Sequence, residues 1–108
     1  GWRMVVDAKG QKAATDYRVL GSGEGLTWLE LTPETGRTHQ VRVHCAELGC
    51  AILGEPMYGT LSSEQRQQPL HLHARGIVLP LSKNKPPIAV IAEPPEHMRA
   101  ALRSCGWR

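Results

Sequence analysis

The sequence predicts an α+β fold built on a mainly antiparallel mixed sheet, with one buried helix and a second helix near the C-terminus. Segments rich in β-branched and apolar residues outnumber segments with helical periodicity. The glycine-rich stretch GSGEG, between Leu20 and Leu26, separates two of these segments and is suited to a hairpin. Strands joined by such a reversal pair antiparallel, which favours the α+β class over a parallel α/β sheet.

The chain has 108 residues, enough for one domain with a single modest core. Its strand-like segments are predicted at Arg3–Val6, Tyr17–Leu20, Leu26–Leu31, 70–81 and 88–93. Between them the sequence indicates a turn or loop at Lys9–Gly10, a polar and exposed loop at Ser62–Pro69, and a basic loop, SKNKPP, at 82–87.

Two helices are predicted. The first runs from about Thr38 to Leu48, is apolar on almost every side, and stops at Gly49, so we expect it to be buried all round. The second begins at Glu96 and places four apolar or small residues on one face, with Gly106 as its stop: Met98, Ala101, Leu102 and Cys105.

Composition narrows the class of protein. Hydrophobic residues make up 41% of the chain, which argues against disorder, but aromatic residues make up only 5%, so the core must be thin. The net charge is +3, and nine arginines against four lysines suit phosphate and base contacts. From charge alone, an ordinary, mildly basic surface is the simpler interpretation. Three cysteines, the absence of a long apolar run and the absence of a leader predict a soluble cytoplasmic protein.

Several kinds of site can be set aside. His39, His44, Cys45 and Cys50 lie within twelve residues, but their spacing does not match a zinc site, and no Cys-x-x-Cys pair exists. The sequence also has no Gly-x-Ser-x-Gly elbow, no phosphate-binding loop and no dinucleotide fingerprint. We therefore expect no metal and no common hydrolase site.

Arg42 stands out because it lies between two valines on the apolar helix. A guanidinium keeps its proton, so a buried one needs a carboxylate or phosphate partner. Two interpretations are open on geometry alone. Arg42 faces an enclosed polar pocket, or it extends along the helix edge to reach the surface.

Longer motifs carry a family resemblance. TGRTHQVRVH is followed by ELGCAILGEPMYG and LHLHA, with KAATDYRVL and WLELTPETG upstream and AEPPEHMRAAL near the end. This order, from Lys12 to Leu102, resembles the RluA-type pseudouridine synthases. The resemblance implies an isomerase that converts uridine to pseudouridine in structured RNA, rRNA or tRNA, through a carboxylate nucleophile without a metal or an organic cofactor. It also implies that residues 1–108 are the C-terminal portion, about half, of that catalytic domain.

The resemblance assigns roles to five residues. Arg42 is similar to the arginine that pairs with the catalytic aspartate, and Tyr17 to the aromatic residue that stacks on the flipped uracil and assists proton transfer. Leu72 is similar to an apolar residue of the uracil pocket, and Arg37 and Arg75 are expected near the RNA.

Two positions depart from the family pattern. Gly54-Glu55 replaces the usual Gly-Asp, at a position that we expect to be structural. The nucleophilic aspartate is missing, because neither Asp7 nor Asp16 has the expected context, so we expect the partner of Arg42 to lie outside this chain.

From this we expect the chain alone to be inactive, and to associate with itself through an exposed sheet edge. The alternative interpretation is a non-catalytic RNA-binding or structural module derived from the same fold.

Overall fold

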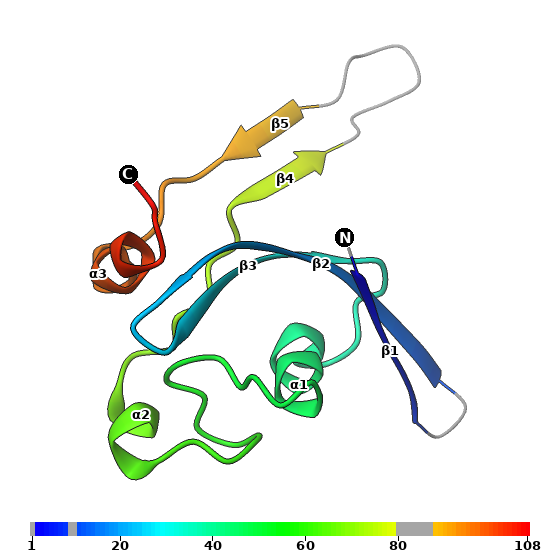
Figure 1. The fold of residues 1–108 in the computed structure, drawn as a ribbon. Helices are drawn as coiled ribbons and strands as arrows, with labels where there is room; N and C mark the ends of the chain where they lie inside the picture. The colour runs from blue at the N-terminus through cyan, green and yellow to red at the C-terminus, as the bar shows by residue number, and fades with distance from the viewer. Residues whose placement is uncertain (1, 9–10, 80–87) are drawn as a thin grey trace.

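The computed structural model describes the backbone of residues 2–8, 11–79 and 88–108 (Figure 1). Eight elements follow one another along the chain, here given with their bounds: β1 (Trp2–Ala8), β2 (Gln11–Gly23), β3 (Leu26–Pro33), α1 (Gln40–Glu47), α2 (Ser63–Gln67), β4 (Gly76–Leu79), β5 (Ile88–Ile91) and α3 (Glu96–Ser104). They form a three-stranded antiparallel sheet in the order β1-β2-β3 and a separate two-stranded antiparallel sheet, β4-β5.

The β2–β3 connection is a two-residue hairpin loop. Glu24 and Gly25 both have positive φ angles, 54° and 77°, as a type I′ turn requires. This backbone twist matches the right-handed twist of the flanking strands, so the GSGEG stretch reverses the chain as the sequence predicts. The register pairs Tyr17 with Leu31, and a shift in the register falls between Val19 and Gly21.

The two longer helices contact different parts of the three-stranded sheet. The sheet curves over α1, which packs against β1, β2 and β3 (Figure 1). The C-terminal end of α3 lies against β2, where a Cβ atom on Gly21 would stand 1.9 Å from the Cys105 carbonyl oxygen and one on Gly23 1.9 Å from that of Ser104. The absence of a side chain at these two positions therefore permits the close approach of α3.

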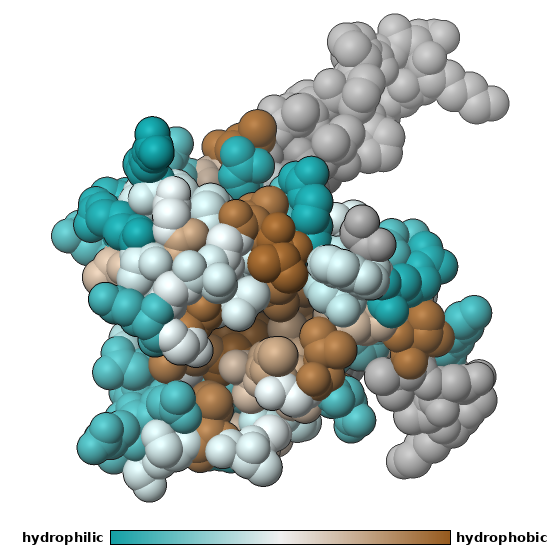
Figure 2. Space-filling view, viewed as in Figure 1, coloured by the Kyte–Doolittle hydropathy of each residue, from teal (hydrophilic) through white to brown (hydrophobic). Residues whose placement is uncertain are grey.

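The core is small, as the scarcity of aromatic residues predicts. Among the side chains that the structure describes, the buried apolar ones are Met4, Ala13, Ala14, Cys45, Met98 and Cys105. Large apolar side chains remain exposed on the sheet and the loops, and apolar surface runs through the middle of the face in Figure 2. The radius of gyration, 15.3 Å, exceeds the roughly 13 Å expected for a compact domain of this length.

The predicted α+β class is confirmed, with antiparallel pairing throughout the described strands. Among the described strands, β4 and β5 pair with each other in a sheet separate from β1-β2-β3. The C-terminal helix and the glycine stops are confirmed: Gly49 and Gly106 have φ angles of 86° and 105°. The turn predicted at Lys9–Gly10 and the loop predicted at 82–87 lie outside the described residues.

Three predicted segments differ from the structure. The loop predicted at Ser62–Pro69 contains α2, which starts with a reciprocal capping box between Ser62 and Gln65. Of the strand predicted at 70–81, residues 70–75 are irregular, β4 covers Gly76–Leu79, and 80–81 lie outside the described residues. The helix α1 is buried only on the side that carries Gln40, His44 and Cys45, so the prediction that it is buried all round is wrong. No helix in the described ranges combines the length and hydrophobicity needed to cross a membrane.

Candidate active site at helix α1

A buried polar cluster attaches α1 to β2. The Gln40 amide oxygen accepts hydrogen bonds from the Thr35 hydroxyl at 2.5 Å and the Arg37 amide at 3.1 Å. These bonds orient the amide so that Nε2 donates to the Ala14 carbonyl at 2.8 Å and to Thr15 Oγ1 at 2.9 Å. The side chain of Gln40 thus positions the start of α1 against the sheet.

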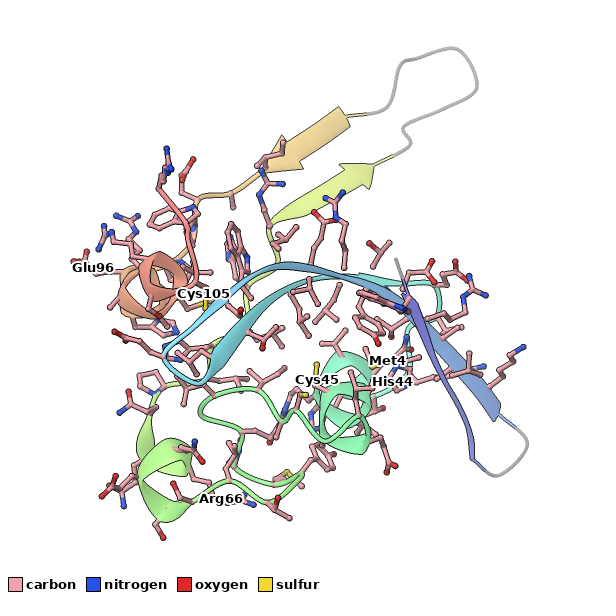
Figure 3. The ribbon with its side chains drawn as sticks, viewed as in Figure 1. Met4, His44, Cys45, Arg66, Glu96 and Cys105 are labelled. Atoms are coloured by element: carbon pink, nitrogen blue, oxygen red, sulfur yellow. The ribbon has the colours of Figure 1, made fainter. Side chains whose placement is uncertain are left out.

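The same cluster includes His44. Thr15 Oγ1, which accepts a hydrogen bond from Gln40 Nε2, is also hydrogen-bonded to His44 Nδ1, 2.7 Å away. Burial lowers the pKa of His44, in keeping with a neutral ring at this position. Figure 3 shows His44 beside Cys45 and Met4, between α1 and the sheet.

Arg42, on the first turn of α1, belongs to the main charged pair of the site. Arg42 Nε donates to Glu55 Oε1 at 2.5 Å and Arg42 Nη2 donates to Glu55 Oε2 at 2.9 Å. This is a bidentate pairing, the strongest geometry available to these two groups. The Glu55 side chain is fully buried and the Arg42 side chain is 14% exposed.

Glu55 is held in place by the loop that carries it. Oε2 also accepts the backbone amide of Met57 at 2.9 Å, and the Glu55 amide bonds the Ile52 carbonyl. Gly54, at φ 86°, passes so close to Pro69 that a Cβ atom would stand 2.4 Å from the Pro69 carbonyl oxygen. The loop therefore needs glycine immediately before the carboxylate, both for its backbone angle and for space.

Arg66, from α2, fixes the outer part of this loop (Figure 3). Its guanidinium donates to four backbone carbonyls: Glu55, Pro56, Gly59 and Leu61. Carbonyls in an irregular loop lack partners from a helix or sheet, so a single multidentate arginine can replace several such bonds. The helix that the sequence did not predict thus supports the segment that positions Glu55.

Tyr58 completes the surroundings of Arg42. The Arg42 guanidinium carbon lies 5.4 Å from the centre of the Tyr58 ring, within the range of a cation–π interaction. The Tyr58 hydroxyl is 3.1 Å from His39 Nδ1, at the residue that precedes α1. Two side chains of the same loop, one charged and one aromatic, therefore restrict the guanidinium.

The electrostatics of the pair favour both charged forms. The hydrogen bonds from Arg42 lower the pKa of Glu55 to about 2, with help from the backbone amides of Met57 and Tyr58, against the opposing effect of burial. The pKa of Arg42 is raised, chiefly by its hydrogen bond to Glu55. The site therefore holds an ionised carboxylate and a charged guanidinium at neutral pH.

The expectation that the partner of Arg42 lies outside this chain is wrong. Of the two interpretations left open by the sequence, the structure favours the enclosed polar one, with Glu55 as the anion. A carboxylate that follows Gly54 in a loop was the available signal, and it was interpreted as structural only. Asp16 is not the partner, because it accepts a bond from Arg3 Nε at 2.8 Å; the side chain of Asp7 lies outside the described ones.

The structure places Tyr17 on β2, two residues after Thr15, and thus on the face of the strand that contacts α1. Its ring is paired with Trp2, 5.6 Å away between centroids, whereas the aromatic neighbour of Arg42 in the described part of the chain is Tyr58. Leu72 is half-buried in the irregular segment before β4. Arg37 and Arg75 are both exposed. These four assignments remain predictions.

Among the residues that the structure describes, no group of three or more His, Cys, Asp or Glu side chains is arranged to hold a metal ion. The two buried cysteines and the exposed Cys50 are all free thiols. Burial raises the pKa of Cys45 to about 11, so this thiol stays protonated and unreactive at neutral pH.

Comparison with known proteins gives a consistent result. Residues 2–47 match the family described as RNA pseudouridylate synthase. The chain is 41% identical over 96 residues to an uncharacterized RNA pseudouridine synthase of Zymomonas mobilis, covering 88% of this chain and 42% of the relative. It is 33% identical over 109 residues to the ribosomal large subunit pseudouridine synthase D of the same organism. This match covers 93% of this chain and 34% of that relative.

A solved structure agrees with these sequences. The human RNA pseudouridylate synthase domain containing 4 superposes with a TM-score of 0.75 at 31% identity, covering 90% of this chain and 44% of that chain. The chain therefore spans less than half the length of the relatives that it matches.

Proposed function

Because the chain belongs to the RluA-type family of RNA pseudouridine synthases, we propose that it forms part of an enzyme that isomerises uridine to pseudouridine in RNA. The observation that carries the proposal is the guanidinium of Arg42, held in one orientation on α1 within the segment that matches the family. A guanidinium that is held in one orientation can bind and orient a nucleophilic carboxylate.

In this proposal each predicted residue has a role at the base or the RNA backbone. The reaction breaks the N-glycosidic bond of uridine, turns the base and rejoins it through carbon, so the base must leave its stack to be reached. Tyr17 stacks on the base and assists proton transfer, and Leu72 lines its pocket. The exposed Arg37 and Arg75 contact phosphates of the RNA, which is an rRNA or a tRNA.

We assign the nucleophile to polypeptide outside these 108 residues. Asp16 is engaged by Arg3 and is partly exposed, and the curated relatives are more than twice as long as the segment matched here. The 108-residue chain should therefore release no tritium from RNA labelled at C5 of uracil, since Tyr17 and Arg42 cannot replace a nucleophilic carboxylate. Turnover by the chain alone would contradict this assignment.

The alternative function is a non-catalytic RNA-binding or structural module. The two functions differ in the gene region upstream of the codon for Gly1. A catalytic protein requires the nucleophilic aspartate to be encoded there, and the polypeptide that includes it should isomerise uridine. Binding of RNA by that longer polypeptide without any tritium release would favour the module. The curated relatives include bacterial and mitochondrial proteins, so the cytoplasmic location stays a prediction.

The exposed apolar side chains support a further part of this proposal. Trp2, Val5 and Val19, on β1 and β2, are exposed by 60%, 48% and 45%. The register pairs Trp2 with Tyr17 and Val5 with Ala14, so Trp2 and Val19 share one face of the sheet and Val5 lies on the other. Large apolar side chains exposed on a small sheet are typical of surfaces that another polypeptide covers. The isolated chain should therefore associate at high concentration, through the sheet edge or through these faces. Light scattering tests this, and a monomer at millimolar concentration would count against it.

A further inference from the structure

The guanidinium of Arg42 uses only part of its donor set. Nε and Nη2 face Glu55, and Nη1 donates no hydrogen bond within the described residues. None of the described buried polar side-chain atoms lacks a partner, so Nη1 reaches the 14% of this side chain that is exposed. Two of the five N–H donors of Arg42 face Glu55, whereas the two of Nη1 and the second of Nη2 donate to no described residue.

Three contacts keep the guanidinium from turning. The bidentate bond to Glu55 fixes its plane, and the ring of Tyr58 lies 5.4 Å from its central carbon. Glu55 in turn cannot move with it, because Oε2 is held by the Met57 amide and the loop is anchored by Arg66. Rotation about the Nε–Cζ bond would break the hydrogen bond from Nη2 to Oε2 of a fully buried carboxylate.

The charge of the pair matters as much as its geometry. A lone buried arginine would present a full positive charge to the site, whereas the Arg42–Glu55 pair has a net charge of zero. A second anion that binds at Nη1 therefore accepts a directed hydrogen bond and interacts with the dipole of the ion pair. It does not experience the full attraction of an unpaired cation.

We propose that Glu55 is a positioning residue: it neutralises Arg42 and holds it so that the free edge of the guanidinium, at Nη1, is presented to a second carboxylate, the nucleophile of the uridine isomerisation. This inference rests on the proposed function, but its geometric part can be tested without activity. It assigns a role to a carboxylate whose position in the sequence indicated only a structural one.

The consequence for catalysis follows from the sign of the charge. Replacing Glu55 by glutamine removes the negative charge and leaves Arg42 uncompensated, which favours the ionised form of the second carboxylate. The acid limb of the pH–rate profile should therefore move to lower pH, while turnover falls because Nη1 is no longer held. Glu55→Asp keeps the charge and should leave that limb in place.

The first experiment uses the 108-residue chain and nitrogen NMR of the arginine side chains. In the unsubstituted chain Nη1 and Nη2 of Arg42 should give separate signals, because rotation about Nε–Cζ is blocked. In Glu55→Gln they should merge, while Glu64→Gln, at an exposed position on α2, should leave them separate. Merged Arg42 signals in the unsubstituted chain would overturn the positioning role.

The second experiment measures tritium release against pH in the polypeptide that includes the upstream region, with the same variants. Glu55→Gln should lower kcat by about tenfold or more with KM changed less than about threefold, the pattern of a lost transition-state interaction. Its acid limb should shift to lower pH, and Glu55→Asp should restore the limb and part of kcat. An unshifted limb in Glu55→Gln, or a loss of activity that follows the folded fraction, would overturn the inference.

The two experiments separate the inference from the function on which it rests. Separate Arg42 signals in a polypeptide that releases no tritium would refute the proposed function and the catalytic role of Glu55, and leave the fixed orientation standing. Merged signals in an active polypeptide would refute the positioning role alone.

Discussion

Arg42→Met should lower the free energy of unfolding of this chain by roughly 3–5 kcal/mol, the cost of leaving one charge of a buried pair without its partner. Glu55 is fully buried and retains only the backbone amides of the loop when Arg42 is removed. Only six apolar side chains are buried among those described, so we expect the free energy of unfolding to be small and a loss of this size to be a large part of it. Urea denaturation followed by circular dichroism measures the change.

Two comparisons make this result specific. Arg18→Met breaks the Arg18–Glu30 pair, whose side chains are 62% and 43% exposed, and should cost less than about 1 kcal/mol. The double variant Arg42→Met/Glu55→Met leaves no buried charge and should recover most of the lost stability. Equal losses in the Arg42 and Arg18 variants would show that the Arg42–Glu55 pair is not buried in solution.

The Arg42–Glu55 pair also determines how the stability of the folded chain changes with pH. The pKa of Glu55 is about 2 in the folded chain, below the roughly 4.3 of an unfolded glutamate. The stabilisation that Glu55 provides is therefore present above about pH 4.3 and is lost as the pH falls toward 2. Arg42→Met should weaken this acid dependence, because it removes the largest cause of the lowered pKa.

Gly21→Ala should displace α3 from the three-stranded sheet. The added methyl would stand 1.9 Å from the Cys105 carbonyl oxygen, a backbone atom that cannot turn aside as the end of a side chain can. Overpacking costs about 1–3 kcal/mol, and the larger part of this range applies when backbone must move. Hydrogen exchange should show faster exchange of the α3 amides and of the Cys105 amide, which bonds the Leu102 carbonyl.

Gly36→Ala is the matched control for this helix displacement. A methyl at Gly36 would meet no atom within 4 Å, and Gly36 lies in the segment before α1. Its stability should change by less than about 0.5 kcal/mol, as is usual for a surface substitution that touches nothing. If Gly21→Ala behaved like Gly36→Ala, α3 would not pack against β2 in solution.

The sequence predicted the elements whose signals are local. The hairpin, the C-terminal helix and both glycine stops follow from turn chemistry and from apolar periodicity within a few residues. The helix α2 was missed because its only signal is the capping pair Ser62 and Gln65, and its five residues bury no side chain. The burial of α1 was overestimated because Val41 and Val43 are half-buried, at the side of a sheet too small to cover them.

The site could be predicted only in part, because its two charged residues are far apart in the sequence. Arg42 was identifiable because a guanidinium among valines requires a partner. Glu55 lies 13 residues away in a loop, and its approach depends on Gly54, on the Arg66 contacts and on the path of the backbone between them. None of these produces a periodic pattern, so the pairing emerges only from the assembled fold.

The most direct test of the account compares tritium release and RNA affinity in the polypeptide that includes the upstream region, with and without Arg42→Met/Glu55→Met. The double variant is chosen because it removes Glu55 together with Arg42, so that the nucleophilic carboxylate is the one charge of the site that loses its partner. The account predicts that turnover falls roughly a hundred- to several-thousand-fold, the rate equivalent of about 3–5 kcal/mol. RNA affinity should change little, because it rests on many phosphate contacts. Unchanged turnover, or affinity lost in proportion to turnover, would contradict the assignment of Arg42 to the catalytic centre.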